Sequence, residues 1–250
     1  MNNVVKVGQL EIGNGIPKIC VPIIADTREN ILQAARKLNG QPFDLVEWRA
    51  DFFVDLYDTN KVMEVLQLMH NEFRETPILF TIRTSAEGGN IPISIEDYIQ
   101  INSEAANSGL VDLIDVEIMR GDDVVFVLVE TAHDAGIKVI ASNHDFRKTP
   151  KKEELITRLC RMQELDADIA KIAVMPRSER DVLVLLDTTL VMKELHGQTP
   201  VVTMSMGDMG RISRISGGVF GSAITFGTAG DSSAPGQMPL NTLHTLLKYI

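Results

Sequence analysis

Cysteine is scarce in this sequence. Its 250 residues include two cysteines, Cys20 and Cys160, and both lie among apolar neighbours. Disulfide-rich domains and thiolate metal sites need several cysteines at fixed spacings. The sequence therefore indicates neither, and we expect a protein of the reducing cytoplasm.

Long hydrophobic runs and an excess of positive charge are also lacking. The longest aliphatic run, VVFVLV at 124–129, is far shorter than the about 20 residues of a membrane-spanning helix. The first residues, MNNVVKVGQLEIG, contain no apolar core of a secretion signal. Lys and Arg number 24 against 34 Asp and Glu, a formal net charge of -10. Nucleic-acid binding needs clustered basic residues, so we expect neither a membrane nor a nucleic-acid partner.

Short apolar strands alternate with helical segments along almost the whole chain. The predicted strands span 18–24, 44–49, 77–83, 111–117, 137–143, 169–174, 199–206 and 222–227. Eight such units predict an α/β fold of the (β/α)8 TIM-barrel type in a single domain over residues 1–250. A doubly wound open sheet is the alternative. No glycine-rich phosphate loop follows the first strand, which weakens the dinucleotide-binding version of that fold.

Turn and cap residues refine this prediction. The segment VVKVGQLEIGNGIP at 4–17 predicts an N-terminal β-hairpin with its turn at Gly13-Asn14-Gly15. Asp26 with Glu29, and Ser94 with Asp97, have the spacing of capping boxes at helix starts.

Strand side chains alternate between two faces, so the polar residues of each strand can be assigned to one face. The pairs that share a face near the ends of their strands are Glu47 with Arg49, Thr81 with Arg83, Asp115 with Glu117, Ser142 with His144, and Met204 with Met206. Barrel enzymes build their sites at this rim, and such a layer could hold a small polar anion. The alternative is a set of structural ion pairs, but so many desolvated charges would stabilise a core less than aliphatic residues.

Lys171 stands inside the apolar strand DIAKIAVM at 168–175. Lysine is rarely buried without a partner or a task, so one interpretation is a nucleophile that forms a Schiff base. The other is a side chain that extends along the strand to reach solvent. A reactive amine needs desolvation or nearby cations, and we expect Arg83 and Arg214 to supply the positive field.

His144 is expected to project from the strand next to that of Lys171. Alone, such a histidine is more often a structural hydrogen-bond donor. Beside a buried lysine, proton transfer is the better hypothesis, and Glu87 would bind the second ring nitrogen. Metal binding by His144, Asp145 and Glu117 is an alternative, but no second well-placed histidine is present and Lys171 would repel the ion. We therefore expect no metal.

The sequence resembles the type I 3-dehydroquinate dehydratase family over nearly its whole length. The motifs that carry the resemblance are KICVPI, EWR at 47–49, FTIR ending at Arg83, EGG at 87–89, SGLVDLIDVE, SNHDF, RMQELDADIAKIAVMP, TMSMG, ISR ending at Arg214, FGSAITFG and SAPGQ at 233–237.

This resemblance implies a (β/α)8 barrel that dehydrates 3-dehydroquinate to 3-dehydroshikimate in the shikimate pathway of aromatic amino acid biosynthesis. It further implies a homodimer without metal or organic cofactor. Lys171 would carry the imine, His144 would be the acid and base, and Glu87 would orient His144. The substrate would be bound by Arg214 at its carboxylate and, at its carboxylate and hydroxyls, by Glu47, Arg49, Arg83, Ser233 and Gln237. The SAPGQ loop would close over it.

Two other functions fit part of the pattern. A class I aldolase would share the barrel and the lysine but would cleave a carbon–carbon bond. A non-catalytic anion-binding barrel would keep the arginines and would tolerate the loss of Lys171 or His144.

Overall fold

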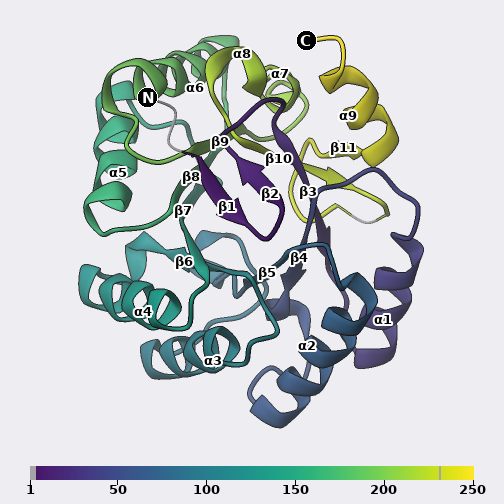
Figure 1. The fold of residues 1–250 in the computed structure, drawn as a ribbon. Coiled ribbons are helices and arrows are strands. Elements are labelled where there is room, and N and C mark those ends of the chain that lie inside the picture. The colour runs from purple at the N-terminus through teal and green to yellow at the C-terminus, as the bar shows by residue number, and fades with distance from the viewer. Residues whose placement is uncertain (1–3, 231) are drawn as a thin grey trace.

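Eight parallel strands form a closed barrel in the computed structural model, which describes residues 4–230 and 232–250 (Figure 1). The strands are β3 (Lys18–Ile23), β4 (Leu45–Arg49), β5 (Ile78–Thr81), β6 (Leu113–Glu117), β7 (Lys138–Asp145), β8 (Ile169–Val174), β9 (Val201–Ser205) and β10 (Ile224–Thr228). Each pairs with its neighbours in the order β10, β3, β4 and onward to β9. A parallel bridge between Val201 and Ser222 joins the two ends. The predicted strands and the barrel are confirmed.

Helices cover the outside of the barrel (Figure 1). They are α1 (Arg28–Lys37), α2 (Thr59–Phe73), α3 (Ile95–Asn107), α4 (Asp122–Asp134), α5 (Lys152–Glu164), α6 (Glu179–Val191), α7 (Arg211–Ile215), α8 (Gly217–Phe220) and α9 (Leu240–Leu247). Short helical turns are η1 (Ala50–Phe52), η2 (Ser85–Glu87), η3 (Ile118–Arg120) and the π-helical η4 (Met192–His196). No described helix is long and apolar enough to cross a membrane.

The helix caps agree with the sequence in one case of two. Ser94 caps α3, and its hydroxyl accepts a hydrogen bond from the Asp97 amide at 3.0 Å. At α1 the prediction of Asp26 as the cap was wrong. Thr27 is the N-cap and accepts from the Asn30 amide, while Asp26 binds the Asn30 side chain. Asp26 and Thr27 both have side chains suited to an N-cap, and the helix begins one residue later than predicted.

An N-terminal hairpin closes one end of the barrel, but its turn differs from the prediction. Strands β1 (Val5–Val7) and β2 (Leu10–Ile12) pair antiparallel, with Val7 opposite Leu10. The turn is therefore Gly8-Gln9, where Gly8 has a φ of +57°, and Gly13-Asn14-Gly15 follows the hairpin. The inner side chains of the hairpin belong to one apolar cluster with the first inward residues of the barrel strands.

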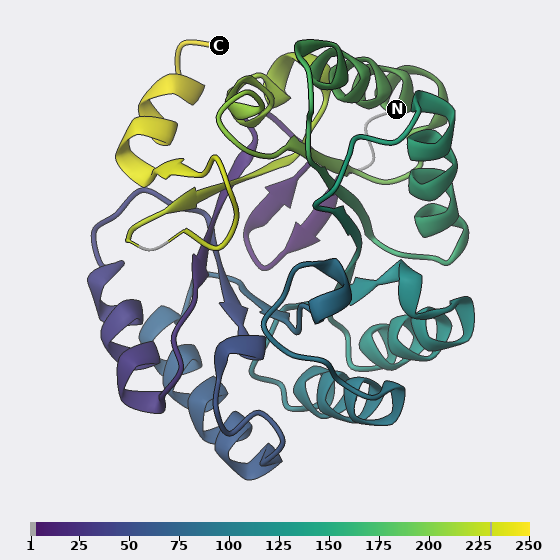
Figure 2. The ribbon, with the colours of Figure 1, turned by 180° about the vertical axis from the view of Figure 1, so that it is seen from behind.

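The barrel interior is layered. Its lowest layer consists of apolar residues, which include Cys20, Leu45, Leu113 and Ile169, and these pack against the hairpin. Two residues further along β4 to β8 the inward side chains become polar, whereas β3, β9 and β10 carry Pro22, Met204 and Phe226 at this level. Figure 1 faces the end that the hairpin covers, and Figure 2 faces the opposite end, where the loops after the strands lie. A site at that opposite end therefore lies directly above a closely packed apolar layer.

Candidate active site

A pocket opens at the carboxyl ends of the barrel strands. Its lining residues are Glu47, Arg49, Arg83, Glu87, Gly88, His144, Phe146, Lys171, Ala173, Met204, Met206, Phe226, Ser233, Ala234 and Gln237. Every site residue predicted from the sequence lines this pocket except Arg214. They come from β4, η2, β7 and β8 and from the loops after β5 and β10, so the barrel itself brings them together.

Lys171 lies in the middle of β8 and is 3% exposed. Its Nζ atom donates to Asp115 Oδ2 at 3.1 Å and lies 4.0 Å from Glu47 Oε1. It also lies 4.5 Å from the centre of the Phe226 ring. The expectation that Arg83 and Arg214 supply a positive field at Lys171 stays a prediction. In the described residues Lys171 forms ion pairs with Asp115 and Glu47. Asp115 pairs with both Lys171 and Arg83 and so separates the two cations.

Asp115 was placed in the polar layer by the sequence but was given no role. It is fully buried in β6, and its Oδ1 accepts from Arg83 Nη2 at 2.7 Å and from the Ser142 hydroxyl at 2.6 Å. Burial alone would raise the pKa of Asp115. The positive charges of Arg83 and Lys171 overcome burial and hold this pKa well below its usual value. Asp115 is therefore an anion that pairs with two cations.

The two inward arginines are held by carboxylates. Arg83 Nη1 donates to Glu117 Oε1 at 2.9 Å. Arg49 binds Asp51 through two parallel hydrogen bonds of 2.7 and 2.8 Å. Asp51, which sequence reasoning missed, follows β4 directly and also accepts from the Arg83 amide at 3.2 Å. These bonds fix both guanidinium groups in the wall of the pocket.

His144 and Glu87 are in direct contact. Glu87 Oε2 lies 3.0 Å from His144 Nδ1 and accepts from the His144 amide at 2.8 Å. Burial raises the pKa of Glu87 to about 7, although the charge of Arg83 opposes this. Burial, with the charges of Arg83 and Lys171, lowers the pKa of His144 well below its usual value. A neutral imidazole that donates Nδ1–H to Glu87 leaves Nε2 free to accept a proton.

Arg214 lies in α7, is 1% exposed and is not among the residues that line the pocket. Its Nη2 donates to the Pro235 carbonyl at 2.9 Å, and Nη1 is 3.5 Å from the Phe226 carbonyl. Its Nε is buried without a hydrogen-bond partner, and no carboxylate among the described residues pairs with it. Burial lowers the pKa of Arg214 to about 10. The guanidinium is thus a buried cation whose charge the described residues do not neutralise.

The loop after β10 brings Ser233 and Gln237 to the pocket. Gln237 Oε1 accepts from the Ser233 amide at 2.9 Å, and Gln237 Nε2 donates to the Ser233 hydroxyl at 2.9 Å. Arg214 binds the same loop at Pro235. The arginine and the loop are therefore one connected unit.

The residues of the metal alternative do not converge. Glu117 is bound by Arg83 and by Thr84, and Asp145 Oδ1 accepts from the Arg147 and Lys148 amides at 2.8 and 3.0 Å. In residues 4–230 and 232–250, no group of three or more His, Cys, Asp or Glu is placed to hold a metal ion.

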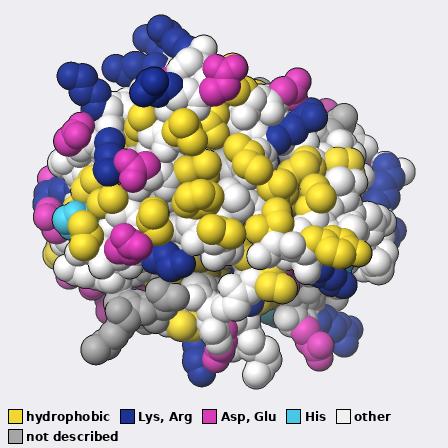
Figure 3. Space-filling model, turned by 90° about the horizontal axis from the view of Figure 1, so that it is seen from above, with side chains coloured by type: hydrophobic (Ala, Val, Ile, Leu, Met, Phe, Trp, Pro, Cys, Tyr) yellow, Lys and Arg dark blue, Asp and Glu magenta, His cyan; other side chains and the backbone are white. Residues whose placement is uncertain are grey.

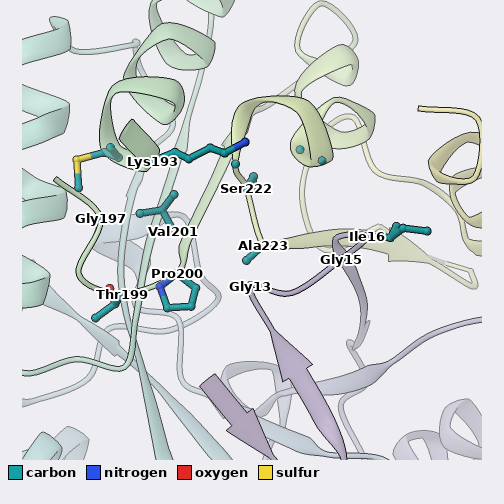
Figure 4. Close-up of a pocket in the computed structure, with 14 residues that line it drawn as sticks. Gly13, Gly15, Ile16, Lys193, Gly197, Thr199, Pro200, Val201, Ser222 and Ala223 are labelled. Atoms are coloured by element: carbon teal, nitrogen blue, oxygen red, sulfur yellow. The ribbon is translucent and has the colours of Figure 1, made fainter. Parts of the chain in front are cut away.

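A second cavity lies at the amino-terminal ends of β9 and β10 (Figure 4). Glycines and apolar residues make up much of its wall, together with Lys193, whose Nζ donates to the Val219 carbonyl at 3.3 Å. Among its described lining residues there is no histidine or carboxylate. It is at the other end of the barrel from Lys171 and lacks a pair of groups for acid–base chemistry.

Comparison with known proteins assigns the family. The model of the type I 3-dehydroquinase family matches residues 19–250. The chain belongs to this family. The 3-dehydroquinate dehydratases of Clostridioides difficile and Klebsiella pneumoniae (strain 342) are 49% and 48% identical to it over 250 residues, which is 100% of this chain and 98% and 100% of theirs.

Solved structures agree. The type I 3-dehydroquinate dehydratase of Clostridium difficile, in a structure with covalently modified comenic acid, superposes with a TM-score of 0.97 and covers 100% of this chain and 98% of that one. The enzyme of Enterococcus faecalis, 41% identical, gives 0.93 and covers 98% and 99%. Type I 3-dehydroquinases are lyases that dehydrate 3-dehydroquinate to 3-dehydroshikimate through a lysine Schiff base, in the shikimate pathway. This membership makes the chain an enzyme.

Proposed function

We propose that the chain dehydrates 3-dehydroquinate with Lys171 as the imine-forming amine and His144 as the acid and base. The observation that carries this assignment is that one pocket holds a lysine buried in a strand and, from the adjacent strand, a histidine bound at Nδ1 by a buried carboxylate. Neither an aldolase phosphate site nor a metal centre is needed to explain this set of residues.

The steps follow from the placement of the groups. The Lys171 amine adds to the substrate ketone and water leaves, which gives an iminium. The iminium acidifies the proton on the adjacent carbon, and His144 Nε2 takes that proton to leave an enamine. The enamine expels the hydroxyl one carbon further, and His144 returns its proton so that the hydroxyl departs as water. Hydrolysis of the product iminium takes up one water and frees the lysine.

Substrate recognition is assigned to the arginines, to Glu47 and to the loop. The charge of Arg214, which no carboxylate among the described residues pairs with, suits the substrate carboxylate, because a guanidinium binds a carboxylate through two parallel hydrogen bonds. Glu47, Arg49, Arg83, Ser233 and Gln237 supply hydrogen-bonding groups around the substrate hydroxyls. Contact of Arg214 and Pro235 couples the charge site to the loop.

A homodimer in the cytoplasm is the proposed state of the protein. Figure 3 shows hydrophobic side chains spread over the side on which α6, α7 and α8 lie in Figure 1. Leu183 of α6, Leu195 of η4, Ile212 of α7 and Val219 of α8 are exposed. Exposed apolar residues over neighbouring helices support an association surface, which sedimentation of the purified protein would test.

The decisive experiment is turnover of 3-dehydroquinate, followed by the ultraviolet absorbance of the conjugated enone product. The wild type should be active, and His144→Ala should be slower by at least ~10²-fold, the usual minimum for losing a positioned proton shuttle. His133→Ala, which changes a histidine on α4 that binds Asp168 at 2.9 Å outside the pocket, is the matched control. Near-wild-type turnover by a well-folded His144→Ala protein would refute the assignment.

A further inference from the structure

A chain of hydrogen bonds joins the outer helix α5 to the catalytic pocket. Arg158 Nη1 on α5 donates to Asn143 Oδ1 at 2.6 Å. Asn143 Nδ2 donates to Glu87 Oε1 at 2.9 Å, and Glu87 Oε2 contacts His144 Nδ1 at 3.0 Å. Three hydrogen bonds thus separate a helix on the outside of the barrel from the histidine ring.

Neither Asn143 nor Arg158 is among the residues that line the pocket. Asn143 is 3% exposed, and the side chain of Arg158 is 17% exposed. Arg158 also pairs with Glu154, one turn earlier on the same helix. Because both residues stand outside the pocket, any effect on the reaction must pass through Glu87 or through the fold.

The carboxamide of Asn143 can turn in two ways, and Arg158 selects one. An amide side chain has an acceptor oxygen on one side and a donor nitrogen on the other. The guanidinium is a pure donor, so it binds the oxygen and directs the NH₂ group at Glu87. If the amide turned over, its NH₂ would face the guanidinium and its oxygen would face the Glu87 carboxylate, and both contacts would be repulsive.

We propose that Arg158 and Asn143 are positioning residues that keep Glu87 ionised and oriented, so that His144 presents Nε2 as the base. This inference rests on the proposed role of His144. A donated hydrogen bond stabilises the carboxylate form of an acid. Asn143 therefore opposes the burial that raises the pKa of Glu87.

Other charges face the same dyad and set the background for this effect. Arg83 Nη1 lies 3.8 Å from Glu87 Oε2 and favours the carboxylate, while Glu117 of β6 opposes it. On His144 act the positive charges of Arg83, Lys171 and Arg49 and the negative charge of Asp115. Among the described residues, the side chain of Arg158 forms hydrogen bonds with Asn143 and Glu154 and with none of these groups. A change in the pH profile of an Arg158 variant can therefore be attributed to the relay, by which we mean the chain of hydrogen bonds from Arg158 through Asn143 and Glu87 to His144.

The first test is Arg158→Met with 3-dehydroquinate as substrate. We expect kcat to fall about tenfold, which corresponds to one charged hydrogen bond lost at a distance, with KM nearly unchanged because the pocket wall is intact. The acidic limb of the kcat/KM profile should move to higher pH, because Glu87 then takes up a proton more easily. Arg158→Lys should restore part of kcat, since an ammonium can donate to Asn143 Oδ1.

Matched controls separate the relay from the helix. Arg161→Met changes another arginine of α5, which binds Asp122 and Glu164, and should leave kcat and the pH profile unchanged. Glu154→Gln breaks the ion pair of Arg158 but keeps its bond to Asn143, and should behave the same way. An Arg158→Met enzyme that matches Arg161→Met in both measurements would overturn the proposal.

A double variant tests the route of the effect. If Arg158 acts through Asn143, the Asn143→Ala and Arg158→Met losses should not add, and the double variant should be no slower than Asn143→Ala alone. Additive losses would show that Arg158 acts by another path and would also overturn the proposal. His144→Ala is measured in parallel. If His144→Ala loses activity while Arg158→Met does not, the positioning role of Arg158 is refuted and the proposed function stands. An active His144→Ala enzyme would instead refute the proposed role of His144.

Discussion

Asp115 Oδ2 lies 3.1 Å from Lys171 Nζ, and Asp115 Oδ1 lies 2.7 Å from Arg83 Nη2, all inside the barrel. One carboxylate therefore pairs with two buried cations, to which Glu117 and Glu47 add further negative charge. Charges removed from water are costly unless they are paired. The ion pair with Asp115 therefore stabilises Lys171 inside the barrel, and Arg83 depends on the same carboxylate.

The first prediction concerns that acid. Asp115→Asn keeps the shape of the side chain but leaves Lys171 and Arg83 with less compensation, so the free energy of unfolding should fall by about 3–5 kcal/mol, the cost of breaking a buried ion pair. Urea unfolding measures it. Asp122→Asn, which breaks a surface pair with Arg161, should cost less than about 1 kcal/mol. Equal costs in the two variants would contradict the role given to Asp115.

The second prediction is a covalent mark on Lys171. Borohydride reduction during turnover should add the mass of the reduced ligand to the peptide that carries Lys171, because the amine is the one proposed to form the imine. Lys171→Met should abolish the label. Lys148→Met, at an exposed lysine beyond β7, should keep it. A label that persists in Lys171→Met would assign the imine to another lysine.

The third prediction separates recognition from chemistry at Arg214. Arg214→Lys keeps the charge but loses the two-pronged geometry, so KM should rise at least tenfold with a smaller change in kcat. Arg211→Lys is the control, since Arg211 is exposed on the same helix and pairs with Asp208. An unchanged KM with a collapsed kcat would move Arg214 into the bond-making steps.

Much of the barrel was predictable because its signals are local. Alternation along a strand is a property of the backbone, so the inward pairs Glu47 with Arg49 and Asp115 with Glu117 could be assigned from the sequence. Alignment of the carboxyl ends then follows from the parallel topology. The same reasoning identified Lys171 as a buried lysine beside His144.

Contacts between elements could not be read in this way. The hairpin turn was misplaced because Gly13-Asn14-Gly15 has the better turn composition, while pairing of Val7 with Leu10 decides the register. The bond from Arg158 to Asn143 depends on how α5 packs on β7, which no spacing in the sequence encodes. Asp51 was missed for the same reason, since the Arg83 and Asn90 amides that it binds are far from it in the sequence.

The last prediction is the pH dependence of the free enzyme, which kcat/KM reports. The active pair is an ionised Glu87 that accepts Nδ1–H from a neutral His144. The pKa of Glu87 is raised by burial to about 7, and that of His144 is lowered. As pH falls, the pair therefore gains its first proton near pH 7, and Glu87 is then no longer the anionic acceptor of Nδ1–H. We therefore expect kcat/KM to fall about tenfold per pH unit below about 7 and to level off above it, as one protonation requires.

The control for this profile is Glu87→Gln, which removes the titrating carboxyl and keeps its size. The variant should be slow, and its residual kcat/KM should no longer show the limb near pH 7. Thr81→Val, which removes a hydroxyl that donates to Glu47 at 3.0 Å in the same pocket layer, should keep the limb. A limb near pH 4.5 in the wild type would mean that Glu87 titrates as an exposed carboxyl does. A limb near pH 7 that survives in Glu87→Gln would belong to another group, and the dyad would then not set the lower pH limit of the reaction.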